Sequence, residues 1–597
     1  MLPRIICHKC EGCSIVAWSV SRERKLSHLL LAATLLLVLT AIIAFSDRIT
    51  TYEISPYDSI PITFWITTTA AYLIFSYVFV RAAKDNHLAR ILGCLLGLTL
   101  LSILLMALPA IRYGTYYTQW DVWFHIGYAS SIAQSGHVNL DENFYPSFHF
   151  LWVNIAQTTG IGVFDLGVYL APPLVAAIVP LTYVVTNRIF QDRSIGAIAA
   201  SLAVFSNGIV GTFPAPWFYS LVLLLLLLAA LVIGSSRPNT STTVLGLLIA
   251  SSLIISHPLA PVFLIVALVM LSLHARVIGP AKFLAKAREK SKAPNRITVG
   301  ATFFALVVVV YITWISFLTF ALQVSVRQVV ASVSSEGIVS PVVYGRFFTV
   351  ILLLKIYSGP VILGIYWLGG LLILAKSGSR AQWRPAYPAI ALALSALVLA
   401  VLFQSLVSGL RENVNRPLTV AILALPSLAG LFLGQTFKKL RRDPEKSAML
   451  LVAIAVPFLL ALPAAYPSPY IALFNYENTQ GVYASIDWAA AYLPRNGEIL
   501  SNSYIGRYAY ALQARDQAYE KLFHFDNTLP SNLTGYISPS KNHTYFIIDR
   551  ETVEVASLDL RAWNSPSARM VDVINKSPGI VRLYDDGDVE IYLSGLG

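Results

Sequence analysis

The chain has 597 residues, of which 56% are hydrophobic and 12% are charged, and its net charge is +12. Soluble globular proteins carry about 25% charged residues, so this composition argues against a soluble protein and indicates repeated membrane spans of about 20 residues. The basic residues lie mainly in loops between apolar segments, with no aromatic stacking platform beside them. We therefore attribute the charge to membrane topology and do not expect nucleic acid as a partner.

Apolar segments recur along most of the chain and predict an α-helical polytopic membrane protein with about 13 spans. We expect spans near 29–45, 59–80, 89–111, 167–187, 195–212, 217–234, 242–256, 259–274, 298–318, 359–376, 387–405, 417–436 and 448–465. The first segment is longer than the apolar core of a signal peptide, about 7–15 residues, so we interpret it as a retained span in a multi-pass protein of the cell membrane.

The basic loops predict the orientation of these spans. The densest, residues 276–296 and 438–446, face the cytoplasm if the N-terminus is internal, where they act as topology signals, with contact to anionic membrane lipids as the alternative. This orientation predicts a cytoplasmic segment 1–28, a transmembrane domain 29–465 with an external loop 112–166, and an extracytoplasmic domain 466–597.

The external loop 112–166 concentrates the polar chemistry of the chain. Its stretch "TQWDVWFHIGYASSIAQSG" predicts an amphipathic helix that ends at Gly136. Asp121 and His125 are four residues apart and therefore share one helical face. Asp121 has three alternative roles: a general base with His125 tuning it or relaying the proton, a metal ligand, or a cap of its own helix. A divalent metal such as Mg or Mn, if present, would take ligands from Asp121, His125, Asp141 and Glu142, and His149 is a further candidate.

The expected spans 242–256 and 259–274 are short. About 15 residues of helix reach about 22 Å, whereas the apolar slab is about 30 Å thick. Between them lies "SHPLAP", which contains His257. A polar break at membrane depth is tolerated where it is buried or lines a cavity. The hairpin therefore either borders an internal cavity or consists of two short tilted helices joined by an ordinary turn.

After residue 466 the sequence becomes soluble in character and predicts a small α/β domain. We expect helices at "SIDWAAAYLP" and "YIGRYAYALQARD", and strands at "GEILSN", "TYFIID", "GIVRLY" and "VEIYL". Asp586 and Gly587 between the last two strands favour a tight hairpin.

The order of these features resembles the GT-C superfamily of membrane glycosyltransferases, in a poorly characterised archaeal and bacterial branch. The resemblance rests on an early external loop with D-x-x-x-H, then "SG", then "YPSFH", and on the tail segment "WAAAYLPRNGEILSNSYIGRY". In this chain the motif residues are Asp121, His125, Gly136, Tyr145, Pro146 and His149.

The resemblance implies transfer of a sugar from a polyprenyl or dolichyl phosphate or diphosphate carrier to an extracytoplasmic protein, glycan or lipid. Asp121 would be the general base, or a metal ligand in enzymes that use diphosphate carriers. We count Asp121 and His125 as catalytic candidates, and the substrate-binding candidates are Tyr145, His149, His257, Arg346, Arg411 and Arg416. The arginines would hold the phosphate, or else serve as interfacial anchors or as partners of Glu412.

One departure from the resemblance concerns the metal. The loop before Asp165 has no D-x-D or E-x-D, and the adjacent Asp141 and Glu142 do not share a helical face. This favours a metal-independent enzyme that uses a monophosphate carrier, although His125 and His149 remain alternative ligands. A transporter or flippase for lipid-linked sugars, and a non-catalytic envelope scaffold of the same fold, remain the competing functions.

Overall fold

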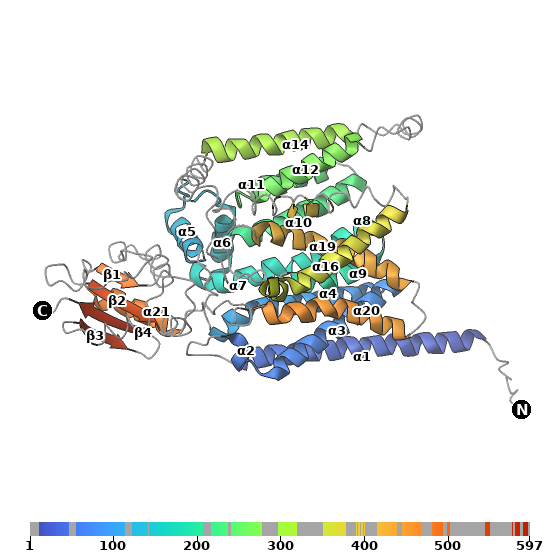
Figure 1. Cartoon of the computed structure of the whole chain (residues 1–597), viewed down its shortest axis with the longest axis horizontal. Helices are drawn as coiled ribbons and strands as arrows, with labels where there is room; N and C mark the ends of the chain where they lie inside the picture. Colours follow the sequence, from blue (N-terminus) through green and yellow to red (C-terminus); the bar gives the residue numbers. More distant parts are fainter. Residues whose placement is uncertain are drawn as a thin grey trace, which may run out of the picture.

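The computed structural model shows a bundle of long helices with a small sheet at one end (Figure 1). The structure describes residues 11–46, 55–113, 122–140, 143–206, 216–236, 240–277, 296–318, 350–377, 390, 392–394, 396–397, 399, 415–438, 444–466, 480–493, 498–501, 544–549, 576, 580–585 and 589–594.

The helices follow the apolar segments of the sequence, because a helix satisfies its own backbone hydrogen bonds where no water is available. The first are α1 (Glu11–Ser46), α2 (Pro56–Ser59), α3 (Ile62–Asp85), α4 (Leu88–Tyr113), α5 (Val122–Ser135) and α6 (Ser147–Thr159). Next come α7 (Val163–Ala176), α8 (Ile178–Phe190), α9 (Arg193–Ser206), α10 (Pro216–Ser236), α11 (Thr240–Ile254) and α12 (Ala260–Val277). The last of the bundle are α14 (Arg296–Thr313) with the π-helical turn η1 (Trp314–Leu318), α16 (Val350–Ser377), α19 (Asn415–Lys438), and α20 (Pro444–Ala461) with the 3-10 turn η2 (Leu462–Ala464).

Seven helical segments in the described part of the chain are long and apolar enough to cross a membrane. They are Arg24–Ser46, Ile62–Asp85, Leu88–Arg112, Val163–Phe190, Tyr357–Lys376, Thr419–Lys438 and Ser447–Ala464. Five shorter apolar helices fall on other expected spans: Arg193–Val204, Trp217–Ala230, Thr243–Ile254, Ala260–Val269 and Ala305–Ser316. The chain is thus a mostly helical, multi-pass membrane protein, as the sequence predicts, while the number of about 13 spans stays a prediction.

Two expected spans differ in detail from the observed helices. The segment expected at 167–187 consists of α7 and α8, which meet at Ala177, although Val163–Phe190 still counts as one spanning segment. The span expected from 359 begins earlier, so Pro360 lies inside α16. Gly359 allows α16 and α20 to pack closely here, because a Cβ there would come within 2.8 Å of the Pro457 carbonyl oxygen of α20.

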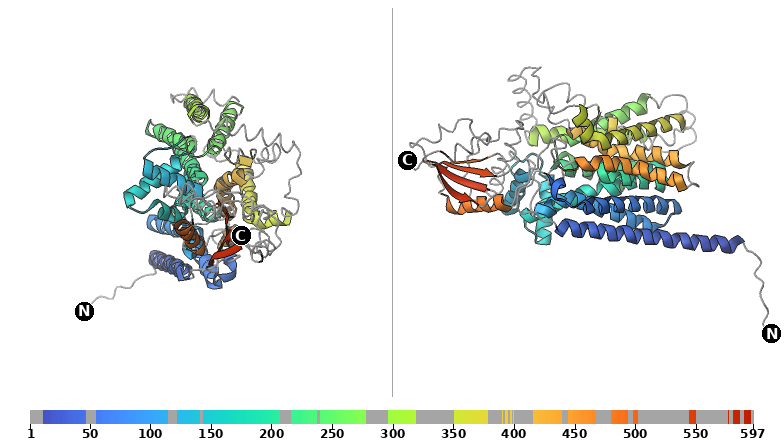
Figure 2. Two further views of the ribbon diagram at one scale, coloured as in Figure 1. Left: turned by 90° about the vertical axis from the view of Figure 1, so that its left-hand side faces the viewer. Right: turned by 60° about the horizontal axis from the view of Figure 1, so that its bottom comes forward.

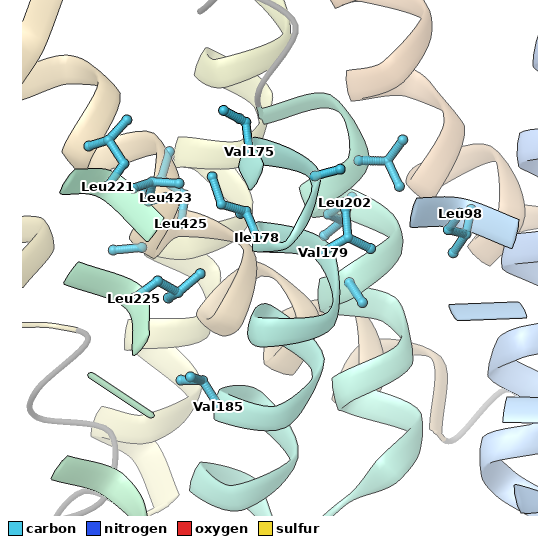
Figure 3. Close-up of a cluster of buried hydrophobic side chains, with 14 of the residues drawn as sticks. Leu98, Val175, Ile178, Val179, Val185, Leu202, Leu221, Leu225, Leu423 and Leu425 are labelled. Atoms are coloured by element: carbon cyan, nitrogen blue, oxygen red, sulfur yellow. The ribbon is translucent and has the colours of Figure 1, made fainter. Parts of the chain in front are cut away.

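The main core lies between the spans. Figure 3 shows leucine, isoleucine and valine side chains that meet from α4, α7, α8, α9, α10 and α19. α19 packs against both α9 and α16. Its Gly430 permits the approach to α9, since a Cβ at this position would lie 2.9 Å from the Ala199 Cβ and from the Ile195 carbonyl oxygen.

The C-terminal part contains α21 (Gln480–Tyr492), β1 (Glu498–Ser501), β2 (Thr544–Asp549), β3 (Ile580–Asp585) and β4 (Val589–Ser594). The sheet order is β1-β2-β4-β3. β1 and β2 are parallel, β4 is antiparallel to β2 and β3, and the β3–β4 register shifts between Arg582 and Tyr584. These elements agree with the four strands and the first helix expected here. The second expected helix and the turn at Asp586 and Gly587 lie outside the described residues.

A second core joins the sheet to α5, α6 and α7. Buried side chains of α21, β2 and β4, among them Ala489, Ile547 and Ile591, pack in one cluster with Ile126 and Trp152. Figures 1 and 2 show the strands projecting from the end of the bundle where α5 and α6 lie, whereas α1 extends past the opposite end. The loop that carries the predicted site and the C-terminal sheet therefore share one end of the molecule.

Candidate functional site

α5 and α6 hold the histidines of the predicted site. α5 ends where Gly136 takes a left-handed conformation (φ 72°) and its N–H donates to the Ile132 carbonyl. This confirms the end expected at this glycine, the residue type that most easily adopts that conformation. α6 ends at Gly160 in the same way. His125 lies near the start of α5 and His149 near the start of α6, so the packing of α5 against α6 brings the two rings together.

The two histidines and Asn143 form a buried chain of polar side chains. The His125 Nδ1 atom lies 3.1 Å from His149 Nε2, and the Asn143 Nδ2 atom lies 2.9 Å from His149 Nδ1. The exposed fractions of His125, His149 and Asn143 are 7%, 0% and 3%. Polar groups buried this deeply require hydrogen-bond partners, and within this chain the central ring of His149 has a partner at each nitrogen.

The contacts of Asn143 set the direction of this chain. When the Asn143 amide donates to His149 Nδ1, the His149 proton lies on Nε2 and is donated to His125 Nδ1. His125 then carries its own proton on Nε2. With the amide turned over, every donor becomes an acceptor and His125 Nε2 becomes a proton acceptor. The orientation of the Asn143 amide thus determines whether His125 Nε2 is a hydrogen-bond donor or an acceptor.

The environment keeps His149 neutral. Burial is the main cause that lowers the pKa of His149 well below its usual value, and the charge of the nearby His125 lowers the pKa further. A neutral imidazole has one donor and one acceptor, which is the state that the chain of contacts requires. A neutral His149 therefore links the donor and acceptor roles of Asn143 and His125 without carrying a charge.

The segment between α5 and α6 is seated on the polar break between α11 and α12. The Ser147 N–H donates to the Ile255 carbonyl at 3.2 Å, and the Ser147 and Ser252 hydroxyls lie 3.1 Å apart. Trp314 of η1 donates from Nε1 to the Phe144 carbonyl at 3.0 Å. The break between the short helices, for which the sequence left a cavity or a simple turn open, thus provides a backbone acceptor for the first residue of α6.

His257 lies in this break and is 5% exposed. Its ring lies 4.9 Å from that of Trp217 and 5.7 Å from that of Tyr145, measured between centroids. The backbone N–H of Leu259 donates to His257 Nδ1 at 3.2 Å, which leaves the proton of the neutral ring on Nε2. Tyr311 donates to the Pro258 carbonyl at 2.9 Å. His257 is thus tied to the loop through Tyr145.

The structure therefore brings four predicted site residues into contact in pairs: His125 with His149, and Tyr145 with His257. Asp121, Asp141, Glu142, Arg346 and Arg411 lie outside the described residues, and of Arg416 the structure describes only the backbone, at the start of α19. Within the described ranges no three His, Cys, Asp or Glu residues are grouped as a metal site. Because three of the four possible metal ligands fall outside those ranges, the metal prediction stays open.

Sequence reasoning missed two residues of this region. Asn143 carries no motif signal of its own beside the acidic pair. Arg112, the basic residue in the last turn of α4, is 1% exposed and donates from Nη2 to the Ser59 hydroxyl at 2.5 Å. An ionisable residue at a span end is often an anchor, but complete burial of an arginine is costly and indicates a function or a partner. α7 contacts both α4 and α5, so Arg112 lies on the site end of the bundle.

Comparison with known proteins identifies the fold through structure rather than through sequence. No protein-family profile matches the chain, and no curated protein sequence matches it. The arabinofuranosyltransferase AftD from Mycobacteria superposes with a TM-score of 0.50 at 14% identity, over 84% of this chain and 40% of that chain. ArnT from Cupriavidus metallidurans bound to undecaprenyl phosphate gives 0.48 at 12% identity, over 84% of this chain and 98% of that chain. The chain thus spans about two fifths of the AftD chain, and the likeness concerns the fold alone.

Proposed function

We propose that this chain, a multi-pass membrane protein with a GT-C-like fold, is a glycosyltransferase that moves a sugar from a polyprenyl phosphate or diphosphate carrier to an extracytoplasmic acceptor. The fold is compatible with sugar transfer, since AftD is an arabinofuranosyltransferase, but a fold does not determine a function. The observation that carries the proposal is the buried chain Asn143–His149–His125, which ends on the helix that directly follows Asp121.

In the proposed reaction, Asp121 is the general base. The acceptor hydroxyl oxygen attacks the anomeric carbon, the bond from that carbon to the carrier phosphate breaks, and the hydroxyl proton passes to the Asp121 carboxylate. The lipid phosphate leaves with the bonding electron pair. Asp121 precedes the first residue of α5, where the positive end of a helix stabilises a carboxylate. His125, four residues on, shares its helical face and tunes the carboxylate.

The histidines behind Asp121 take different roles in this proposal. His149 has no exposed surface, so it acts through His125 as a positioning residue instead of contacting the substrate. His257 holds the loop through Tyr145, and Tyr145, which is half-buried, remains the candidate for stacking against the sugar. The separation of roles follows from exposure, because a side chain without exposed surface cannot contact a ligand.

The phosphate of the carrier requires cations. Arg346, Arg411 and Arg416 stay candidates, and Arg112 is added because it is buried at the site end of α4. A guanidinium binds phosphate through paired N–H groups. If the carrier is a diphosphate, Mg or Mn held by Asp121, His125, Asp141 and Glu142 is the alternative source of positive charge.

The proposed topology places the site outside the cytoplasm. The shared core of α5, α6, α21 and the sheet supports one location for the loop 112–166 and for the domain 466–597. The N-terminal segment 1–28 then lies in the cytoplasm. Cysteine labelling from the two sides of sealed vesicles, at single cysteines placed in each segment, would give opposite accessibility.

The test of the function is release of sugar from polyprenyl-phosphate and polyprenyl-diphosphate donors, with native membrane extract as the source of acceptors. Wild type is compared with Asp121→Asn and with Asp487→Asn, an exposed carboxylate on α21. We expect Asp121→Asn alone to lose turnover. Loss of wild-type turnover with a chelator would show that the reaction requires a metal, for which Asp121 is a candidate ligand. Equal turnover by all three proteins would remove Asp121 from the chemistry. Donor consumption by none of them would favour a transporter or flippase for lipid-linked sugars, or a non-catalytic scaffold.

A further inference from the structure

The end of the bundle opposite the sheet contains a groove between α3, α9, α19 and α20. α4 ends beside the site loop, so α3, which precedes it in the opposite direction, ends on the far side at Asp85. α19 ends there as well, and α9 and α20 begin there. The groove is therefore separated from the candidate site by the length of the spans.

The groove combines a basic rim with an apolar wall. Arg81, Lys84 and Lys438 contribute the charges. The apolar wall comes mainly from Ile195, Ile198, Leu450, Leu451 and Ile454. Within the described part of the chain, no acidic side chain lines it. A ligand that matches both features has an anionic head and a hydrocarbon tail.

Arg81 is held in position for an anion. Its Nη2 donates to the Ser447 hydroxyl of α20 at 2.9 Å, and its guanidinium carbon lies 5.6 Å above the centre of the Tyr77 ring. These contacts fix the plane of a half-buried guanidinium between two helices, and a fixed guanidinium loses less conformational entropy on binding a phosphate. Ser447 uses one donor of the five in an arginine side chain.

The helix end nearby does not compete for the anion. The Asp192 carboxylate already accepts from the backbone N–H groups of Ser194 and Ile195 at 2.8 and 3.3 Å. This carboxylate caps the N-terminus of α9, so the attraction for an anion comes from the three cationic side chains. Basic pockets between spans are typical sites for anionic lipid headgroups.

We propose that this groove binds an anionic membrane phospholipid, with its phosphate at Arg81 and Lys438 and an acyl chain along α9 and α20. The apolar wall favours a lipid over a free phosphate ion. A lipid has a hydrocarbon tail that can cover the apolar side chains, which is favourable, whereas a free phosphate ion has none. The groove is independent of the candidate transferase site and of the function proposed for it.

The test uses the purified full chain in detergent and native mass spectrometry after addition of phosphatidylglycerol or phosphatidylcholine. We expect retention of phosphatidylglycerol to exceed that of phosphatidylcholine. Arg81→Gln and Lys438→Gln should each weaken phosphatidylglycerol binding about tenfold, the effect of losing one charged contact. Lys376→Gln, an exposed lysine in the last turn of α16 outside the groove, is the matched control and should leave binding unchanged.

A second variant separates the groove from general attraction between charges. Leu451→Trp fills the apolar wall at a half-buried position without changing charge, and we expect it to reduce lipid retention as well. If Lys376→Gln weakens binding as much as Arg81→Gln, or if Leu451→Trp has no effect, the groove assignment is overturned. Displacement of the lipid by millimolar inorganic phosphate or glycerol 3-phosphate would show that a free anion is the ligand and would refute the lipid.

Discussion

His125 and His149 lie with their Nδ1 and Nε2 atoms 3.1 Å apart, on two helices that are separated in sequence by a loop. Neither ring can change its proton position without a matching change in the other, because one nitrogen must donate and the other accept. Asn143 closes the chain on the far side of His149. The state of the outer nitrogen of His125 is therefore coupled to Asn143, a buried residue two side chains away.

Asn143→Leu removes the group that fixes this direction while it keeps a similar volume. We expect a decrease in kcat of about 10- to 100-fold, the usual effect of losing a group that orients a functional histidine, with the KM for the lipid donor unchanged. Asn143→Asp should retain more activity and move the acid limb of the pH profile of kcat upwards, because a carboxylate raises the pKa of His149. Steady-state kinetics between pH 5 and 8 measure both effects.

Asn154→Leu on the exposed face of α6 is the control for that series, and it should behave as wild type. An Asn143→Leu enzyme with wild-type kcat and an unshifted pH profile would show that Asn143 only fills space.

The lowered pKa of His149 makes stability depend on pH. In the unfolded chain this residue takes up a proton as the pH falls through about 6.5, whereas the folded protein takes it up only at lower pH. The unfolded state then binds more protons, so His149 stabilises the fold fully above about 6.5 and progressively less as the pH falls towards the folded pKa. For one proton, the loss is about 1.4 kcal/mol per pH unit in that window.

We therefore expect the thermal midpoint of the wild-type protein in detergent to fall more steeply between pH 7 and 5 than that of His149→Gln. Exposed His137 on the same loop offers the comparison, since His137→Gln should keep the wild-type slope. Parallel curves for wild type and His149→Gln would contradict a buried neutral histidine.

Sequence alone predicted the local features of the site. The aromatic amphipathic pattern and Gly136 predicted α5 and its end, and alternating apolar residues predicted the four strands. Each of these depends on neighbours within a few residues, whose periodicity or backbone preference is visible in one stretch of sequence.

The contacts that assemble the site could not be predicted in this way. The pairing of Asn143 with His149 depends on the path of the connection into α6, and the bond from Ser147 to Ile255 joins segments more than a hundred residues apart. Neither has a periodic signal. The boundary between α7 and α8 was missed for a related reason, since the hydropathy of the segment is continuous across Ala177.

The approach of α19 to α9 depends on the missing side chain of Gly430. In Gly430→Ala the new methyl group would meet the Ala199 Cβ and the Ile195 carbonyl oxygen at about 2.9 Å, so the helices must separate. We expect a destabilisation of about 1–3 kcal/mol, the usual cost of overpacking, seen as a lower thermal midpoint in detergent. Gly364→Ala on α16 has nothing within 4 Å of the new atom and should be neutral or stabilising. If both substitutions have the same effect, the close approach does not limit stability.

One contact that holds the site loop is an indole hydrogen bond, from Trp314 Nε1 to the Phe144 carbonyl at 3.0 Å. Trp314→Phe removes this bond while it keeps an aromatic ring, and the net cost of such a bond is about 1 kcal/mol. Because the bond ends on the loop and not inside a helix, we expect the loss to appear as about fivefold faster hydrogen exchange in residues 143–147, and as weaker donor binding if the loop forms the proposed site.

Tyr311→Phe is the matched control for Trp314→Phe. It also removes one hydrogen bond, from α14 just before η1. That bond ends on the Pro258 carbonyl between α11 and α12 and not on the site loop. Exchange of residues 143–147 should therefore respond to Trp314→Phe much more than to Tyr311→Phe. Equally faster hydrogen exchange in both variants would mean that the loop and the hairpin open as one unit. The Trp314 hydrogen bond would then have no separate effect on the loop.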